Sequence, residues 1–213
     1  MSSTKDAGRP LKDTGFSRRG FMQGVGVSGG ALGTGLLTPE EAAAQAASGV
    51  IAGETPITLT INGKPYKTSV EPRMTLLDVL RHNLDLTAAK RVCDRGTCGA
   101  CTVTLDGKAV YACTVLAMDA QGHQVQTLEG VSSGRNPHPL VTAFVNNDAQ
   151  QCGYCTPGFV MASKAFLDRT PNPTYEDVKE GLGGNLCRCG TYMGIRKAVL
   201  EAANGGKGGQ KNA

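Results

Sequence analysis

The stretch CDRGTCGAC, residues 93–101, carries three of the chain's eight cysteines in a predicted loop. Their spacing is C-x4-C-x2-C, and Cys113 follows at the end of the next predicted hairpin. Gly96 and Gly99 allow the backbone to wrap closely and to direct N–H groups at sulfur. The pattern is typical of four thiolates that hold a [2Fe-2S] cluster.

A thiolate-ligated [2Fe-2S] cluster carries a charge of about −2, which becomes about −3 on reduction. Such a site needs hydrogen-bond donors and nearby positive charge. Lys90, Arg91 and Arg95 are candidates for that positive field. The alternative is that they are ordinary solvated surface cations.

Strand signals surround this cysteine loop on both sides. Apolar residues alternate with threonine before Asn62-Gly63, and Asp106-Gly107 is a second hairpin turn signal. Thr75 with Asp78 indicates the N-cap of a short helix between the two hairpins. The predicted strands are 57–61, 66–70, 102–105 and 108–112.

The other four cysteines form two pairs, Cys152-x2-Cys155 and Cys187-x-Cys189, in a region of helical periodicity. Thr156-Pro157 and Gly190-Thr191 predict that a capped helix begins after each pair. A helix N-terminus favours an anion, and a cluster of negative charge is one. The apolar stripes predict four short helices, around residues 140–145, 159–166, 174–182 and 191–199.

The first 46 residues have the order of an export signal. The segment 17–23, SRRGFMQ, contains paired arginines, the apolar stretch 24–37 is rich in glycine, and 44–46 reads Ala-Gln-Ala. Paired arginines before phenylalanine resemble a twin-arginine signal, which exports folded proteins. Export of a folded protein would also let a metal centre be inserted in the reducing cytoplasm. The alternative is a disordered basic N-terminus.

Together these motifs resemble the small iron-sulfur subunit of the xanthine oxidase family of molybdenum hydroxylases, most closely that of periplasmic aldehyde oxidoreductases. The resemblance covers residues 56–203 and rests on the first cysteine loop, on 151–158 (QCGYCTPG) and on 185–190 (NLCRCG). It implies an α+β chain. A plant-type ferredoxin-like β-grasp domain at 56–130 precedes a four-helix-bundle domain at 137–203. A linker is expected at 47–55, and residues 204–213, rich in Gly and Lys, are expected to be a disordered tail.

The resemblance also implies partners and residue roles. Gln151 and Cys189 correspond to the positions that contact the molybdopterin of a large subunit, and the first cluster would face FAD on a medium subunit of a heterotrimer. Electrons would run from molybdenum through the second cluster to the first and then to FAD. No substrate-converting residues are expected on this chain. The cluster ligands are Cys93, Cys98, Cys101, Cys113, Cys152, Cys155, Cys187 and Cys189.

Other interpretations of the sequence stay open. Four disulfides would make the chain a secreted binding module, and the second group of cysteines could hold zinc. The same relay could serve a hydroxylase of N-heterocycles, purines or carbon monoxide, or pass electrons to a cytochrome. His82, His123 and His138 adjoin no cysteine motif and are expected to be surface or helix-end residues. A net charge of +4 without a basic stripe argues against nucleic acid as a partner.

Overall fold

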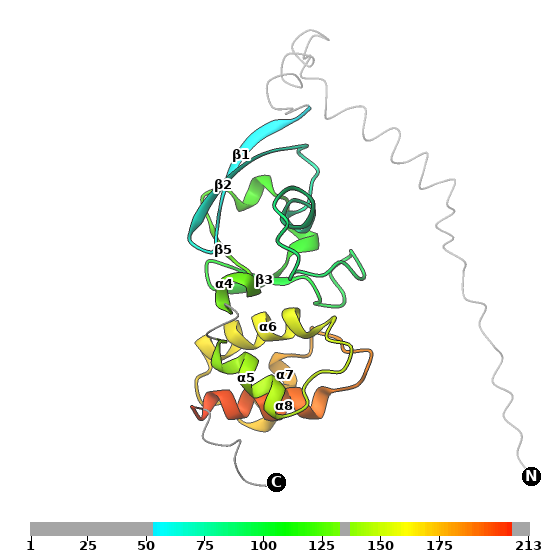
Figure 1. Ribbon diagram of the computed structural model, residues 1–213, viewed down its shortest axis with the longest axis vertical. Coiled ribbons are helices and arrows are strands. Elements are labelled where there is room, and N and C mark those ends of the chain that lie inside the picture. The colour runs from blue at the N-terminus through cyan, green and yellow to red at the C-terminus, as the bar shows by residue number, and fades with distance from the viewer. Residues whose placement is uncertain (1–52, 133–136, 206–213) are drawn as a thin grey trace, which may run out of the picture. The chain divides into compact units, whose positions relative to one another are not determined.

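The computed structural model describes residues 53–132 and 137–205 of the chain. The predicted export signal at 1–46 lies outside the described residues, as do most of the predicted linker and most of the predicted tail. What the structure describes is a mixed sheet with short helices, followed by a helical part (Figure 1).

Five strands form one mixed sheet in the order β2-β1-β5-β3-β4. β1 pairs antiparallel with β2 and parallel with β5, and β3 pairs antiparallel with β4 and with β5. The short strand β5 therefore joins the two hairpins into a single sheet. The strands are β1 Thr55–Ile61, β2 Lys64–Val70, β3 Thr102–Leu105, β4 Lys108–Tyr111 and β5 Gln124–Gln126.

Both predicted hairpin turns are confirmed. Asn62 and Gly63 have φ values of 52° and 74°, and the second turn at Asp106-Gly107 has the same left-handed pattern. The prediction that the second return strand runs to Ala112 was wrong by one residue, because a 3-10 turn, η2 (Ala112–Thr114), begins there. That turn buries Cys113 instead of continuing the sheet.

The helix predicted after Thr75 is present, with the expected capping box. Thr75 Oγ1 accepts from the Asp78 N–H at 3.1 Å, and the Asp78 carboxylate accepts from the Thr75 N–H at 3.3 Å. The α-helical turn α3 (Leu76–Asp78) continues as a π-helical turn, η1 (Val79–Asn83). Leucines of this helix are fully buried in the sheet core, so burial rather than helix length holds it in place.

The helical part contains the four helices that the apolar stripes predicted, shown in yellow-green to red in Figure 1. α5 and α6 both contact α8, α7 also contacts α8, and α6 packs against β3 and β4 of the sheet. Phe144, Phe159 and Ile195 are buried at the centre of this part. The helices are α5 Pro139–Asn146, α6 Thr156–Arg169, α7 Tyr175–Gly181 and α8 Tyr192–Ala203.

Besides η2, three short elements had no sequence signal. They are the strand β5, the 3-10 turn η3 (Met118–Ala120) and the single-turn helix α4 (Leu128–Val131). Each is too short to show a periodic pattern, and β5 is placed by its pairing with β1 and β3 rather than by its own residues.

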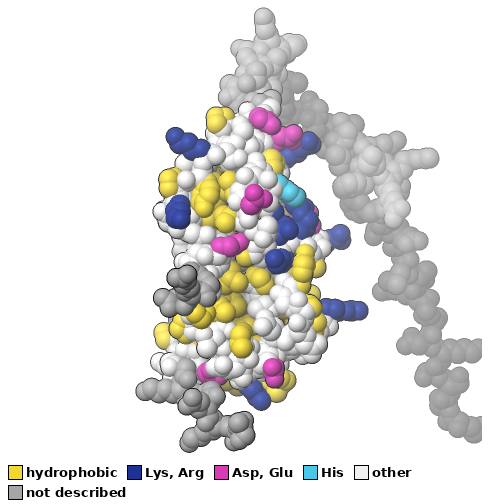
Figure 2. All heavy atoms as spheres, in the orientation of Figure 1, with side chains coloured by type: hydrophobic (Ala, Val, Ile, Leu, Met, Phe, Trp, Pro, Cys, Tyr) yellow, Lys and Arg dark blue, Asp and Glu magenta, His cyan; other side chains and the backbone are white. Residues whose placement is uncertain are grey.

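The surface carries scattered charge. On the face drawn in Figure 2, the described lysine and arginine side chains alternate with acidic ones and form no continuous basic stripe. No helix in the described part of the chain is both long enough and apolar enough to span a lipid bilayer.

The two neighbours Phe144 and Val145 on α5 give a matched test of the helical core. Phe144 is 1% exposed, whereas Val145 is 61% exposed. We expect Phe144→Ala to lower the free energy of unfolding by about 3–5 kcal/mol because it leaves a cavity in a packed core.

Val145→Ala should change the unfolding free energy by less than about 0.5 kcal/mol. Chemical denaturation followed by circular dichroism measures both variants. Equal losses would contradict the packing described for α5.

Candidate metal centres

The first set of four cysteines surrounds the loop that connects the π-helical turn to β3. Cys98, Cys101 and Cys113 are buried, and Cys93 is partly exposed. The Gly96 N–H points at Cys113 Sγ at 3.3 Å, and the Thr97 N–H points at Cys93 Sγ at 3.4 Å. The loop therefore aims backbone donors at sulfur, as its glycines predicted.

The second set lies at the starts of α6 and α8. Cys155 is the N-cap of α6, and Cys189 lies two residues before Thr191, the N-cap of α8. Cys187 is buried, Cys155 and Cys189 are partly exposed, and Cys152 is exposed. The structure thus brings the two sequence-distant pairs together at two helix N-termini.

Within each set the thiols approach one another in pairs. In the first set the Cys93 thiol lies close to that of Cys98, and the Cys101 thiol lies close to that of Cys113. In the second set the Cys155 thiol lies close to that of Cys187, and the Cys189 thiol lies close to that of Cys152. Within the described ranges, no three Cys, His, Asp or Glu side chains are grouped so that they could hold a single metal ion.

The expected side-chain caps at these two helix starts are not formed. Thr156 is the first residue of α6 rather than its cap, and its buried hydroxyl has no hydrogen-bond partner among the described residues. Thr191 does occupy the N-cap of α8 but makes no capping bond. Its hydroxyl lies 3.2 Å from Cys187 Sγ and 3.2 Å from the Ala149 carbonyl oxygen. It therefore contacts these two groups instead of capping the first turn of α8.

The thiols of the two sets differ in pKa for identifiable reasons. Hydrogen bonds, led by that from the Thr97 side chain, lower the pKa of Cys93 to about 6. Burial raises the pKa of Cys187, but hydrogen bonds led by the Thr191 side chain outweigh burial and bring the pKa down to about 7. Burial raises the pKa of Cys101 and of Cys155 to about 12. Each set therefore holds one thiol already disposed to be the thiolate that metals bind.

The three predicted cations have different surroundings. The Arg91 guanidinium pairs with Asp78 and with Asp94, so much of its positive charge is neutralised locally. Arg95 donates to the Cys93 carbonyl oxygen at 3.2 Å. The Lys90 ammonium lies 5.9 Å from the centre of the Tyr154 ring. Of the three, Arg95 is directly bonded to the backbone of a cysteine in the set.

Hydrogen bonds join the two cysteine loops to each other. The Cys98 carbonyl oxygen accepts from the Leu186 N–H at 2.9 Å, and the Gly99 carbonyl oxygen accepts from the buried Asn185 amide at 2.9 Å. The Tyr154 hydroxyl donates to the Arg91 carbonyl oxygen at 3.3 Å. We call the contacts of Cys98 and Gly99 with Asn185 and Leu186 the loop junction.

Two glycines make the loop junction possible. Gly99 has a φ of 68°, and a Cβ there would lie 2.6 Å from the Asn185 side chain. A Cβ on Gly158 of α6 would lie 2.4 Å from the Gly99 carbonyl oxygen. The glycine-rich segment 181–185 also makes contacts within the chain, because Asn185 is buried and the Gly184 carbonyl oxygen accepts from the Tyr111 hydroxyl at 2.8 Å.

A cavity of about 490 Å³ opens beside the loop junction. Its lining combines Cys98 of the first set with three cysteines of the second set. Three of the chain's exposed large apolar side chains also line it: Val92, Tyr154 and Leu186. The second set therefore faces an open, largely apolar surface.

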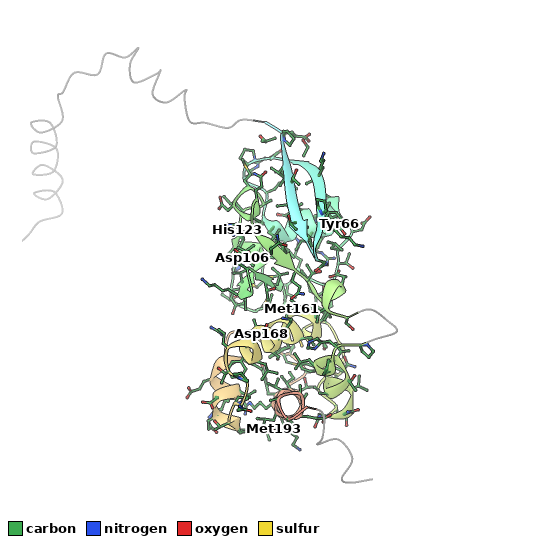
Figure 3. All side chains as sticks on the ribbon, turned by 90° about the vertical axis from the view of Figure 1, so that its left-hand side faces the viewer. Tyr66, Asp106, His123, Met161, Asp168 and Met193 are labelled. Carbon is green, nitrogen blue, oxygen red and sulfur yellow. The ribbon has the colours of Figure 1, made fainter. Side chains whose placement is uncertain are left out.

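The histidines lie at turns and helix ends. His123, just before β5, lies beside Asp106 of the β3–β4 turn (Figure 3), with Nδ1 2.5 Å from the carboxylate. His138 is the N-cap of α5 and accepts from the Leu140 N–H at 3.2 Å. His82 is in the π-helical turn.

Two domain families match the chain, one after the other. Residues 59–128 match the 2Fe-2S iron-sulfur cluster binding domain, and residues 127–200 match the [2Fe-2S] binding domain. One of the subunits of nicotinate dehydrogenase from Pseudomonas putida is 45% identical over 150 residues, which are 70% of this chain and 96% of that protein. This chain belongs to the iron-sulfur subunits of the xanthine oxidase family.

Other relatives in the family agree with this assignment. The aldehyde oxidoreductase iron-sulfur-binding subunit PaoA of Escherichia coli is 42% identical over 163 residues, 70% of this chain and 71% of that one. Quinoline 2-oxidoreductase of Pseudomonas putida matches with a TM-score of 0.67 and 41% identity over 72% of this chain and 98% of that chain. Aldehyde oxidoreductase of Desulfovibrio desulfuricans matches with a TM-score of 0.68 and 42% identity over 73% of this chain and 18% of that chain. The iron-sulfur chain is thus part of an oxidoreductase.

Gly99 and Gly107 give a matched pair for testing the loop junction. Both have positive φ values, 68° and 78°, but a Cβ at Gly107 would meet nothing within 4 Å. Alanine at either position costs about 1–2 kcal/mol from left-handed backbone strain. Only Gly99→Ala should also displace Asn185.

We therefore expect Gly99→Ala to lower the melting temperature more than Gly107→Ala and to reduce the iron content of the purified protein. Thermal denaturation and iron analysis measure both effects. Identical behaviour of the two variants would contradict the close approach at Gly99.

Proposed function

We propose that this chain holds two [2Fe-2S] clusters and is the electron-transfer subunit of a molybdenum-containing aldehyde oxidoreductase. The observation that carries the proposal is the gathering of all eight cysteines into two sets of four, joined through the loop junction. A bound [2Fe-2S] cluster takes up and releases single electrons, so two clusters in series relay electrons between partner subunits.

The paired thiols support a ligand assignment. Each iron of a [2Fe-2S] cluster takes two thiolates, and the contacts pair the cysteines two by two. In the first cluster, Cys93 and Cys98 would hold one iron, and Cys101 and Cys113 the other. In the second cluster the pairs are Cys155 with Cys187 and Cys152 with Cys189. The proximity of the paired thiols supports this assignment.

The chain would then consist of two cluster domains. The sheet order, with β1 parallel to β5 and a helix between the hairpins, supports a β-grasp domain over residues 56–130. The mutual packing of α5 to α8 supports a four-helix-bundle domain over residues 137–203. The export signal at 1–46, the linker at 47–55 and the tail at 204–213 complete this proposed organisation.

The second cluster would face the molybdenum subunit. Gln151 and Cys152 are exposed and Cys189 is partly exposed, so the pterin of a bound large subunit could reach them. The apolar side chains of Val92, Tyr154 and Leu186 beside them are suited to burial against a protein partner. The role of Gln151 would be to hydrogen-bond the pterin through its amide.

The first cluster would face FAD on a medium subunit, which completes a heterotrimer. Asp94, Arg95 and Thr97 of its loop are exposed, so this end of the chain is also open to a partner. The polar character of these residues differs from the apolar surface around the second cluster. That difference suits two partners, one at each end of the relay.

Aldehyde is proposed as the substrate class because PaoA is named as belonging to an aldehyde oxidoreductase. The substrate would bind on the large subunit, since this chain serves as the electron carrier. The paired arginines at positions 18 and 19 support export of the assembled complex to the periplasm through the twin-arginine route.

Cysteine variants test the relay and the order of its clusters. The purified complex should contain about four iron and four sulfide per iron-sulfur subunit, with two distinct reduced paramagnetic signals. Cys189→Ala should remove the second signal and stop reduction of FAD by aldehyde. Cys98→Ala should remove the first signal, spare reduction of the second cluster and block onward transfer.

Each variant is the control for the other, because each keeps one cluster. Rapid-freeze spin resonance and iron analysis read the outcome. Zinc in place of iron would end the proposal, and full turnover by Cys98→Ala would show that the proposed order, with the first cluster between the second cluster and FAD, is wrong.

Export is tested by replacing Arg18 and Arg19 together with lysine, which keeps the charge but removes the arginine pair. We expect the complex to stay in the cytoplasm with its clusters intact. Cell fractionation followed by activity staining measures this, and the control is Lys5→Arg, which lies outside the motif. Normal export of the double variant would disprove the twin-arginine assignment.

A further inference from the structure

The hydroxyl of Thr191 has an unusual position beside the second set of cysteines. It lies 3.2 Å from Cys187 Sγ and 3.2 Å from the Ala149 carbonyl oxygen. Thr191 is 9% exposed and Cys187 is 6% exposed. Water therefore has little access to either group, and the hydroxyl must satisfy its hydrogen bond within the protein.

The Thr191 hydroxyl can make this contact because it does not cap the backbone N–H groups of α8. Thr191 occupies the N-cap of α8, yet its side chain accepts no bond from the first turn of that helix. Its hydroxyl has one proton and two acceptors within reach. The Ala149 carbonyl oxygen and Cys187 Sγ therefore compete for that single proton.

The two acceptors differ in charge. The Ala149 carbonyl is neutral, whereas a metal-bound cysteine sulfur carries negative charge and is the stronger acceptor. Adding an electron to the cluster increases the negative charge on its sulfur ligands. A hydroxyl poised between the two acceptors therefore bonds sulfur more strongly in the reduced state than in the oxidised state.

We propose that Thr191 is a positioning residue that donates its hydroxyl hydrogen bond to Cys187 Sγ and so raises the reduction potential of the second cluster. The inference rests on the proposed function, since it requires a cluster on the second set. Through this bond the chain would make the second cluster the better acceptor of electrons arriving from the molybdenum subunit. Hydrogen bonds to cluster sulfur are one of the ways in which proteins set such potentials.

The hydrogen-bond donors to sulfur are different in the first set. They include the backbone N–H groups of Gly96 and Thr97. The Thr97 side chain also lowers the pKa of Cys93, but it is exposed, so water can take over its interaction with the sulfur. Removing the buried Thr191 hydroxyl, in contrast, should have an effect that water does not repair.

Three substitutions at position 191 separate the hydroxyl from the shape of the side chain. Thr191→Val keeps the branched shape without a hydroxyl, Thr191→Ala removes both, and Thr191→Ser keeps the hydroxyl. The measurement is a redox titration of both clusters, followed by spin resonance, on the complete complex. Valine and alanine should each lower the equilibrium constant for reduction of the second cluster about tenfold. This corresponds to a reduction potential lower by about 59 mV for one electron.

Two controls accompany the titration. Thr191→Ser should keep the wild-type potential, and the first cluster should be unchanged in every variant. Ser163→Ala removes another buried hydroxyl of the helical part, one without a hydrogen-bond partner among the described residues. Ser163 lies eight residues along α6 from Cys155, about 12 Å of helix, so its loss should leave both potentials unchanged.

The outcomes are distinct. An unchanged or higher potential of the second cluster in the valine and alanine variants would overturn the inference. So would loss of that cluster from both variants, which would make Thr191 a residue needed for assembly. Absence of iron from the wild-type complex would instead overturn the proposed function, and the two failures can be told apart.

Discussion

The loop junction is the constraint on which the two cysteine sets depend. The carbonyl groups of Cys98 and Gly99 are buried and would cost about 1–3 kcal/mol each without partners. Leu186 and Asn185 supply those partners from a segment more than eighty residues later in the chain. Because Leu186 directly precedes Cys187, satisfying the first loop also places the second set. The sheet and the helices hold these backbone groups and the Asn185 side-chain amide in contact.

Steric complementarity limits the junction as strictly as hydrogen bonding does. The absence of a side chain at Gly158 lets α6 touch the carbonyl of Gly99, and Gly99 in turn leaves room for the Asn185 amide. Side chains at these positions would push α6, which starts after Cys155, away from β3. The packing of α6 on the sheet therefore also sets the position of the Cys155 sulfur, because Cys155 is the N-cap of this helix.

Much of the fold and of the site could be predicted from sequence because the decisive signals were local. Asn62-Gly63, Asp106-Gly107 and the Thr75 capping box each fix a turn or helix start through neighbouring residues. The misses required distant contacts. β5 exists because β1 and β3 flank it, and the Thr191 hydroxyl turns to Cys187 and Ala149, which no local rule reveals. The pairing of thiols within each set likewise depends on tertiary folding.

The two cysteine sets also differ in how much chain they enclose. The first closes within residues 93–113, a span that contains the β3–β4 hairpin, whereas the second needs residues 152–189 and two helices. Chains emerge from the ribosome N-terminus first, and short loops close at lower entropic cost. The first set can therefore gather before the residues that will cover it have been made. During synthesis there is an interval in which Asn185 and Leu186 have not yet been made. In that interval the Cys98 and Gly99 carbonyl groups lack these hydrogen-bond donors.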